Sequence, residues 1–110
     1  MTVASTLAVS ARADGFLARL QVVFATPVVE IDGVAHPIAW LTTHRFVVAP
    51  GQHVVRMYFR RHDSTGGHCT TTLTTGPGES VHLDATLTGK RFVIGTSRAR
   101  THPLDGPQAV

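Results

Sequence analysis

Hydrophobic and polar residues alternate along most of this chain in short segments. The clearest is 80–87, where Val81, Leu83, Ala85 and Leu87 share one face and polar residues occupy the other. A period of two is typical of a β-strand with one buried face. The same alternation, or a short β-branched run, marks the other segments that we expect to be strands: 16–24, 28–31, 45–48, 52–60, 69–75 and 91–94.

Turn-forming residues separate these segments at regular intervals. Asp32-Gly33 supplies the positive φ angles of a tight hairpin, and Pro50-Gly51 fixes one backbone position and frees the next. About seven short strands at this spacing predict an all-β fold, an antiparallel β-sandwich of Ig-like type, with a barrel as the alternative.

The domain organisation follows from the same pattern. We expect an N-terminal segment over 1–13, a β-sandwich domain over 14–98 and a flexible basic tail over 99–110. The tail contains Pro103, Gly106 and Pro107, which disfavour regular structure. Residues 4–13 could form a short helix, although their Thr, Val and Ser residues weaken it.

The central part of the chain contains three motifs in a fixed order. A strand ends in Ile31-Asp32-Gly33, the stretch 50–55 reads Pro-Gly-Gln-His-Val-Val, and 78–83 reads Gly-Glu-Ser-Val-His-Leu. Over about residues 27–87 this order resembles the small β-sandwich modules related to PEGA domains. The resemblance implies a β-sandwich that serves as an accessory or binding module, and it supplies no catalytic residue. The chain departs from the family by the additional segment 16–24 and by the lack of a recognisable signal peptide or membrane anchor.

Composition narrows the classes of function. The chain has 110 residues and only 15% charged residues, below the roughly 25% of ordinary globular proteins. The net charge of +3 lies in 90–110, where Phe92 is the one aromatic residue, so a nucleic-acid interface is not expected. No apolar run could span a membrane. The uncharged start carries no secretory pattern, and with the single Cys69 it predicts a cytoplasmic protein without disulfides.

The chain contains seven histidines, and this is the compositional feature that suggests a metal-binding site. His62, His68 and Cys69 surround the predicted turn at 64–67, and His82 could join them from a neighbouring strand. Imidazole and thiolate groups bind zinc or copper, but this spacing matches no established zinc motif. The alternative is that the histidines are polar surface residues, with His53 satisfied locally by a backbone carbonyl.

No catalytic signature is present. His68 and Cys69 are adjacent, so on a strand they point to opposite faces and cannot form a nucleophile–base pair. We therefore predict a non-enzymatic binding or assembly module, a homo-oligomer or a subunit of a larger assembly. The neutral strand 69–75 lacks the Lys or Pro that commonly protects a sheet edge. The alternative is a metal-binding module that uses His62, His68, Cys69 and His82. Trp40, the one tryptophan, is expected to anchor the core beside Phe46 and Phe59.

Overall fold

The computed structural model describes residues 3–15, 25–88 and 91–100, and all of its regular structure is β-strand. These residues contain no helix, and so no helix that is long and apolar enough to cross a membrane. The eight strands are β1 (Ser5–Asp14), β2 (Thr26–Ile31), β3 (Val34–Pro37), β4 (His44–Val48), β5 (Gly51–Arg60), β6 (Thr65–Thr75), β7 (Glu79–Thr88) and β8 (Arg91–Arg100).

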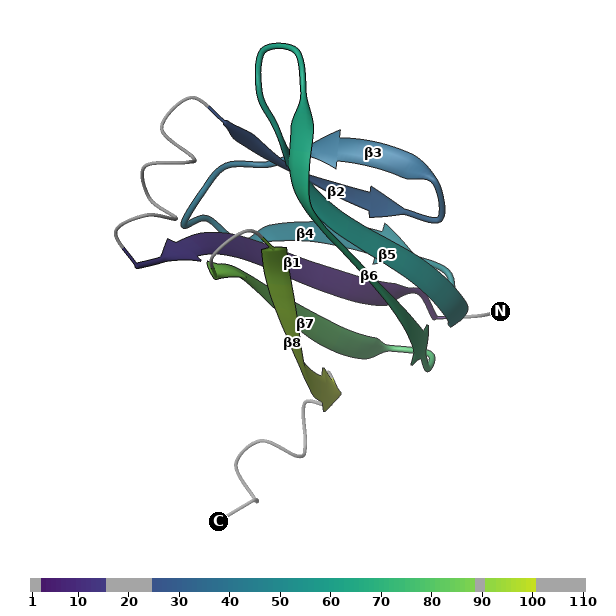
Figure 1. Ribbon diagram of the computed structural model, residues 1–110. Helices are drawn as coiled ribbons and strands as arrows, with labels where there is room; N and C mark the ends of the chain where they lie inside the picture. The colour runs from purple at the N-terminus through teal and green to yellow at the C-terminus, as the bar shows by residue number, and fades with distance from the viewer. Residues whose placement is uncertain (1–2, 16–24, 89–90, 101–110) are drawn as a thin grey trace.

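These strands follow one another in the order β3-β2-β5-β6-β8-β7-β1-β4 and curl into a half-barrel (Figure 1). The all-β prediction is confirmed, but two separate sheets packed as a sandwich are not shown. The sheet is nevertheless nearly divided, because β6 and β8 pair at one position, Gly67 with Arg91. The two terminal strands approach through the rings of His36 and Phe46, whose centroids lie 4.8 Å apart.

β1 is where the structure departs most from the sequence prediction. The sequence allowed a short helix over 4–13 and predicted no strand there, but the segment is a strand with Leu7, Val9 and Ala11 buried on one face. It pairs antiparallel with β4 and parallel with β7, so the sheet is mixed and the expectation of a purely antiparallel arrangement is wrong. β-branched and hydroxyl residues fit a strand enclosed by two neighbours better than an isolated helix.

The hydrophobic core fills the concave side of the half-barrel. Val81, Leu83, Ala85 and Leu87 of β7 are buried as their alternation predicted, and so are Val55, Met57 and Phe59 of β5. Trp40 is half-buried against this core. Its ring stacks on Phe92 at a centroid distance of 6.0 Å, and its Nε1 donates a hydrogen bond to the carbonyl of Ala25. Trp40 therefore anchors the core as expected, with Phe92 as its stacking partner.

The predicted turn at Asp32-Gly33 closes the β2–β3 hairpin. The φ angles of Asp32 and Gly33 are 52° and 87°. Positive φ at both central residues is the geometry that suits the right-handed twist of a two-residue hairpin.

Two predictions fall partly or wholly beyond the described residues. The expected strand 16–24 lies outside them, as do residues 101–110 of the expected tail. β8 continues to Arg100, so residues 99 and 100 belong to a strand and the predicted boundary after 98 does not coincide with a strand end.

Candidate functional site

The four predicted metal ligands do not converge. The β5–β6 turn closes at 61–64, where the amide of Arg61 donates a hydrogen bond to the carbonyl of Ser64. The predicted turn at 64–67 is therefore misplaced, because Gly66 and Gly67 belong to β6. His62 is exposed in the turn, whereas His82 lies on β7 in the other half of the sheet. Within the described ranges no three His, Cys, Asp or Glu side chains form a group that could hold a metal ion.

His68 and Cys69 are directed to opposite faces of β6, as adjacent strand residues must be. The His68 ring stacks on Tyr58 with centroids 5.0 Å apart, and its Nε2 lies 3.0 Å from the Thr65 hydroxyl oxygen. Cys69 is partly buried and packs against the core. His68 is therefore engaged on the outer face, and Cys69 contributes apolar contact inside.

A polar cluster lies on the outer face of β2, β5 and β6. Arg56 donates a hydrogen bond of 2.8 Å to Glu30, and the Tyr58 hydroxyl donates one of 3.0 Å to the other carboxylate oxygen. These two bonds, that from Arg56 foremost, lower the pKa of the Glu30 carboxyl. Burial, reinforced by Glu30, raises the pKa of the Tyr58 hydroxyl. Glu30 thus accepts a hydrogen bond on each carboxylate oxygen, and the two bonds join β2 to β5 on the outer face.

His53 joins two turns that are distant in sequence. Its Nδ1 lies 2.6 Å from a carboxylate oxygen of Asp32, and its Nε2 lies 2.6 Å from the carbonyl oxygen of Ala49. Both neighbours can accept hydrogen bonds, so this position favours the protonated imidazole, in which both ring nitrogens donate. The bond to Asp32, and next the bond to Ala49, raise the pKa of His53, while the bond from His53 is the main cause that lowers the pKa of Asp32. The predicted carbonyl contact of His53 is confirmed. The Asp32 contact was not predicted.

The His53–Asp32 contact predicts a stability that depends on pH. Because the pKa of His53 is higher in the folded state than its ordinary value of 6.5, protonation of His53 stabilises the fold. This stabilisation is complete below pH 6.5 and is lost as the pH rises through the pKa of the folded state. Because the pKa of Asp32 is lower in the folded state than its ordinary value of 3.8, the ionised carboxylate stabilises the fold above pH 3.8. This stabilisation is lost as the pH falls through the pKa of the folded state. We therefore expect urea denaturation to show a lower free energy of unfolding at pH 8.5 than at pH 5.5. His53→Gln should abolish this contribution, and His62→Gln, an exposed histidine, should retain it. Equal pH dependence in both variants would contradict the assignment.

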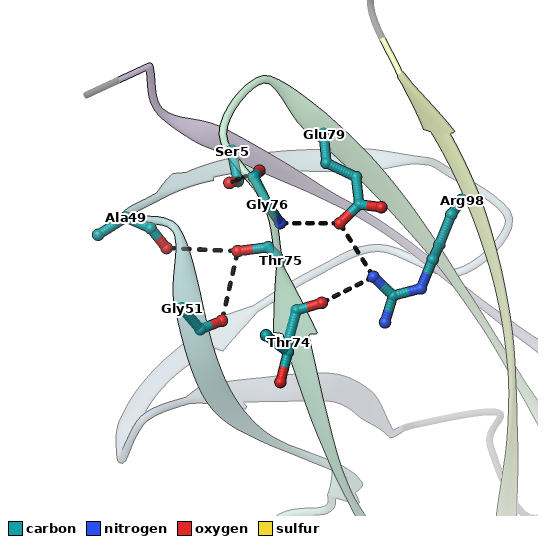
Figure 2. A network of polar contacts seen from close by, with 8 residues as sticks. All are labelled: Ser5, Ala49, Gly51, Thr74, Thr75, Gly76, Glu79 and Arg98. Carbon is teal, nitrogen blue, oxygen red and sulfur yellow. Dashed lines mark hydrogen bonds and ion pairs between the residues drawn. The ribbon is translucent and has the colours of Figure 1, made fainter. Parts of the chain in front are cut away.

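A second polar network closes the seam between β6 and β8 where ladder hydrogen bonds are lacking (Figure 2). From β8, Arg98 donates 2.7 Å to the carbonyl of Thr74 and 2.9 Å to the Glu79 carboxylate. The same carboxylate oxygen accepts the amide of Gly76 at 2.9 Å, and the Ser5 hydroxyl donates to the Gly76 carbonyl at 2.7 Å. Glu79 has a side chain only 12% exposed, so its charge is stabilised by these donors.

This network also bears on the segment 69–75, which was expected to be an exposed sheet edge. β5 pairs with one side of β6 along its length, whereas β8 pairs with the other side at Gly67 alone, which lies before 69–75. Arg98 occupies a carbonyl there with its side chain. β6 is thus internal to the order of the sheet, yet within 69–75 its side toward β8 has no strand partner among the described residues, as expected of an edge.

The two strands at the ends of the order are β3 and β4. Three large hydrophobic side chains are exposed there: Val34 on β3, Leu41 on the connection and Val47 on β4, at 58%, 82% and 76%. Leu41 also has a φ of 60°, a conformation that residues other than glycine rarely adopt, while its amide donates to the carbonyl of Ala11. Leu41 is thus an exposed apolar residue held in an uncommon backbone conformation.

Comparison with protein-family models, with curated proteins and with solved structures finds no match for this chain. The resemblance to PEGA-like modules therefore stays a prediction.

Proposed function

We propose that this protein is a non-enzymatic assembly module that forms a homo-oligomer through β4, at one free end of its curled sheet. The observation that supports the proposal is the exposed Val47 on a terminal strand that has a neighbour on one side only, β1. An edge strand offers unpaired backbone groups to a strand of another chain, and exposed apolar residues add contact area. We also propose that the fold is a PEGA-like β-sandwich. Its two layers would be β3-β2-β5-β6 and β8-β7-β1-β4, which meet at the single β6–β8 pair.

β4 is favoured over β3 by the way the two edges are protected. β3 has four residues and ends in Pro37, which removes one backbone donor from the edge. β4 contains neither Lys nor Pro, and Arg45 is its one residue with a permanent charge. A missing backbone donor interrupts edge pairing, so β4, with five residues and no Pro, is the better template for a second copy.

The test is the oligomeric state of the untagged protein by analytical ultracentrifugation across a concentration series. We expect a multiple of 11.8 kDa that dissociates on dilution. Val47→Lys should weaken self-association by about tenfold or more, since it places a repelling charge on each copy at the edge.

Val54→Lys is the matched control. Val54 is an exposed valine on β5, a strand flanked on both sides by β2 and β6. Val54→Lys makes the same change of side chain and charge as Val47→Lys but leaves β4 unchanged, so self-association should persist. A wild-type protein that remains monomeric at every concentration would overturn the proposal, as would equal weakening in the two variants.

A further inference from the structure

A row of neighbouring residues crosses the outer face of the half formed by β4, β1, β7 and β8. Ala8 is in register with Arg45 on one side and with His82 on the other, and His82 is in register with Ser97. Adjacent strands are about 4.8 Å apart, so Arg45 and His82 stand roughly two strand spacings from each other with alanine between them. The small side chain of Ala8 therefore leaves a depression between two larger polar ones.

This depression is a groove of about 300 Å³. Ala8 forms its floor, Arg45 and His82 flank it, and hydroxyl groups come from Thr43, Ser80 and Ser97. The backbone neighbour Arg98 also lines the groove, but its guanidinium is bound to Glu79 and Thr74. The side chains free to act in the groove are thus one guanidinium, one imidazole and three hydroxyls, all of which can donate hydrogen bonds.

Arg45 is one of the described arginines that form no ion pair, as are Arg60 and Arg91. Arg56 pairs with Glu30, Arg98 with Glu79, and Arg12 donates to the hydroxyl of Thr86. For Arg45, in these same ranges, no ion pair is formed. An uncompensated guanidinium in a hollow of donors is the arrangement that attracts an anion.

Asp84 is the acidic residue nearest to this row, and it is already occupied. Its carboxylate accepts a hydrogen bond of 2.7 Å from Ser10 and lies 3.5 Å from Nε2 of His82. That Nε2 is buried, yet it forms no hydrogen bond to any described residue. A buried polar atom without a hydrogen bond is costly, but a ligand in the groove cannot reach Nε2, so the other ring nitrogen of His82, Nδ1, is the one that can donate there.

We propose that the groove between Arg45 and His82 binds an oxyanion of the phosphate class. Arg45 supplies the planar fork of donors that matches two phosphate oxygens, and His82 donates from the opposite wall. The hydroxyls of Ser80, Ser97 and Thr43 complete the set. A phosphate presents enough acceptor oxygens to engage both walls, whereas a monocarboxylate has two oxygens and engages one.

The test is a titration with inorganic phosphate at constant ionic strength, followed by amide chemical shifts in NMR spectra. We expect saturable shifts at β4, β1 and β7 around the groove, and weaker binding of acetate. Arg45→Gln and His82→Gln should each weaken phosphate binding about tenfold or more, because each removes a charge-assisted donor. Arg45→Lys, which retains the charge and loses the fork, should weaken it less than Arg45→Gln.

Arg12→Gln is the matched control, since Arg12 lies on β1 on the same outer face and the change in charge is identical. It should bind phosphate within about twofold of the wild type. Equal loss in Arg12→Gln and Arg45→Gln would show general attraction to a basic surface and overturn the proposal. Shifts that do not saturate, or that map away from the groove, would also overturn it. Ultracentrifugation of the same samples distinguishes this proposal from the assembly proposal. A monomer that binds phosphate would support the anion site and contradict the oligomer formed through β4.

Discussion

Replacement of Phe92 by alanine is expected to lower the free energy of unfolding by about 3–5 kcal/mol. Phe92 is the largest fully buried side chain among the described residues, at 0% exposure. Its ring stacks on Trp40 and lies on β8, directly beyond the single pair that joins the two parts of the sheet. Removing it leaves a cavity where β8 and the Trp40 loop meet the core, and the surrounding strands cannot collapse to fill it.

The measurement is urea denaturation followed by far-UV circular dichroism, because Trp40 fluorescence will itself change when its stacking partner is removed. Val93→Ala provides the control. Val93 is the next residue on β8 but is directed to solvent, so its loss should cost no more than about 0.5 kcal/mol. If both variants unfold at the same urea concentration, Phe92 does not hold the core as the structure indicates.

The second large effect is expected from Gly67→Ala. Gly67 has a φ of +73°, and a Cβ atom there would lie 2.9 Å from the Phe59 ring and 3.3 Å from a methyl group of Leu87. Left-handed backbone costs an alanine about 1–2 kcal/mol, and overpacking adds about 1–3 kcal/mol. We expect thermal unfolding to report a loss of about 2–5 kcal/mol in total.

Gly33→Ala separates these two causes. Gly33 has a φ of +87°, but nothing lies within 4 Å of the position that a Cβ would take. Its substitution should therefore incur the backbone cost alone, about 1–2 kcal/mol. Equal destabilisation in the two variants would mean that the Phe59 ring moves away without cost and that its contact with the β6 backbone contributes nothing.

Local sequence was sufficient to predict most of the described strands and the carbonyl contact of His53. The alternation in β7 identified its buried face because a strand with one solvent face needs a period of two. Asp32-Gly33 identified a hairpin because its positive φ angles depend on those two residues alone. The carbonyl contact of His53 was predictable because Ala49 is four residues away across a tight turn.

Contacts between distant segments could not be found in the same way. Glu30 with Arg56, Asp32 with His53 and Arg98 with Thr74 join residues 21 to 26 positions apart. Each depends on which strands become neighbours and in which register, and no periodicity in one strand encodes that. The groove at Arg45 is a stronger case, since its row draws one residue from each of four strands.

The strand β1 was mistaken for a possible helix because its parallel partner is so remote. A parallel pair needs a long crossover, and here the connection from β1 to β7 includes five other strands. Nothing within 5–14 indicates that a second strand will cover it. The seam beside 69–75 could not be predicted for a related reason, since the strand across it, β8, follows later in the chain.

The central position of β1 also determines when this protein can fold during its synthesis. β1 is made first, yet Ser10 meets Asp84 across 74 residues. At about 5–20 residues per second the ribosome needs roughly 4–15 s to deliver that partner. Throughout this interval the β7 side of β1 stays open to other nascent chains. Folding is thus completed only after nearly all the described strands have been translated, and until then the open side of β1 is a strand edge of the kind that promotes aggregation.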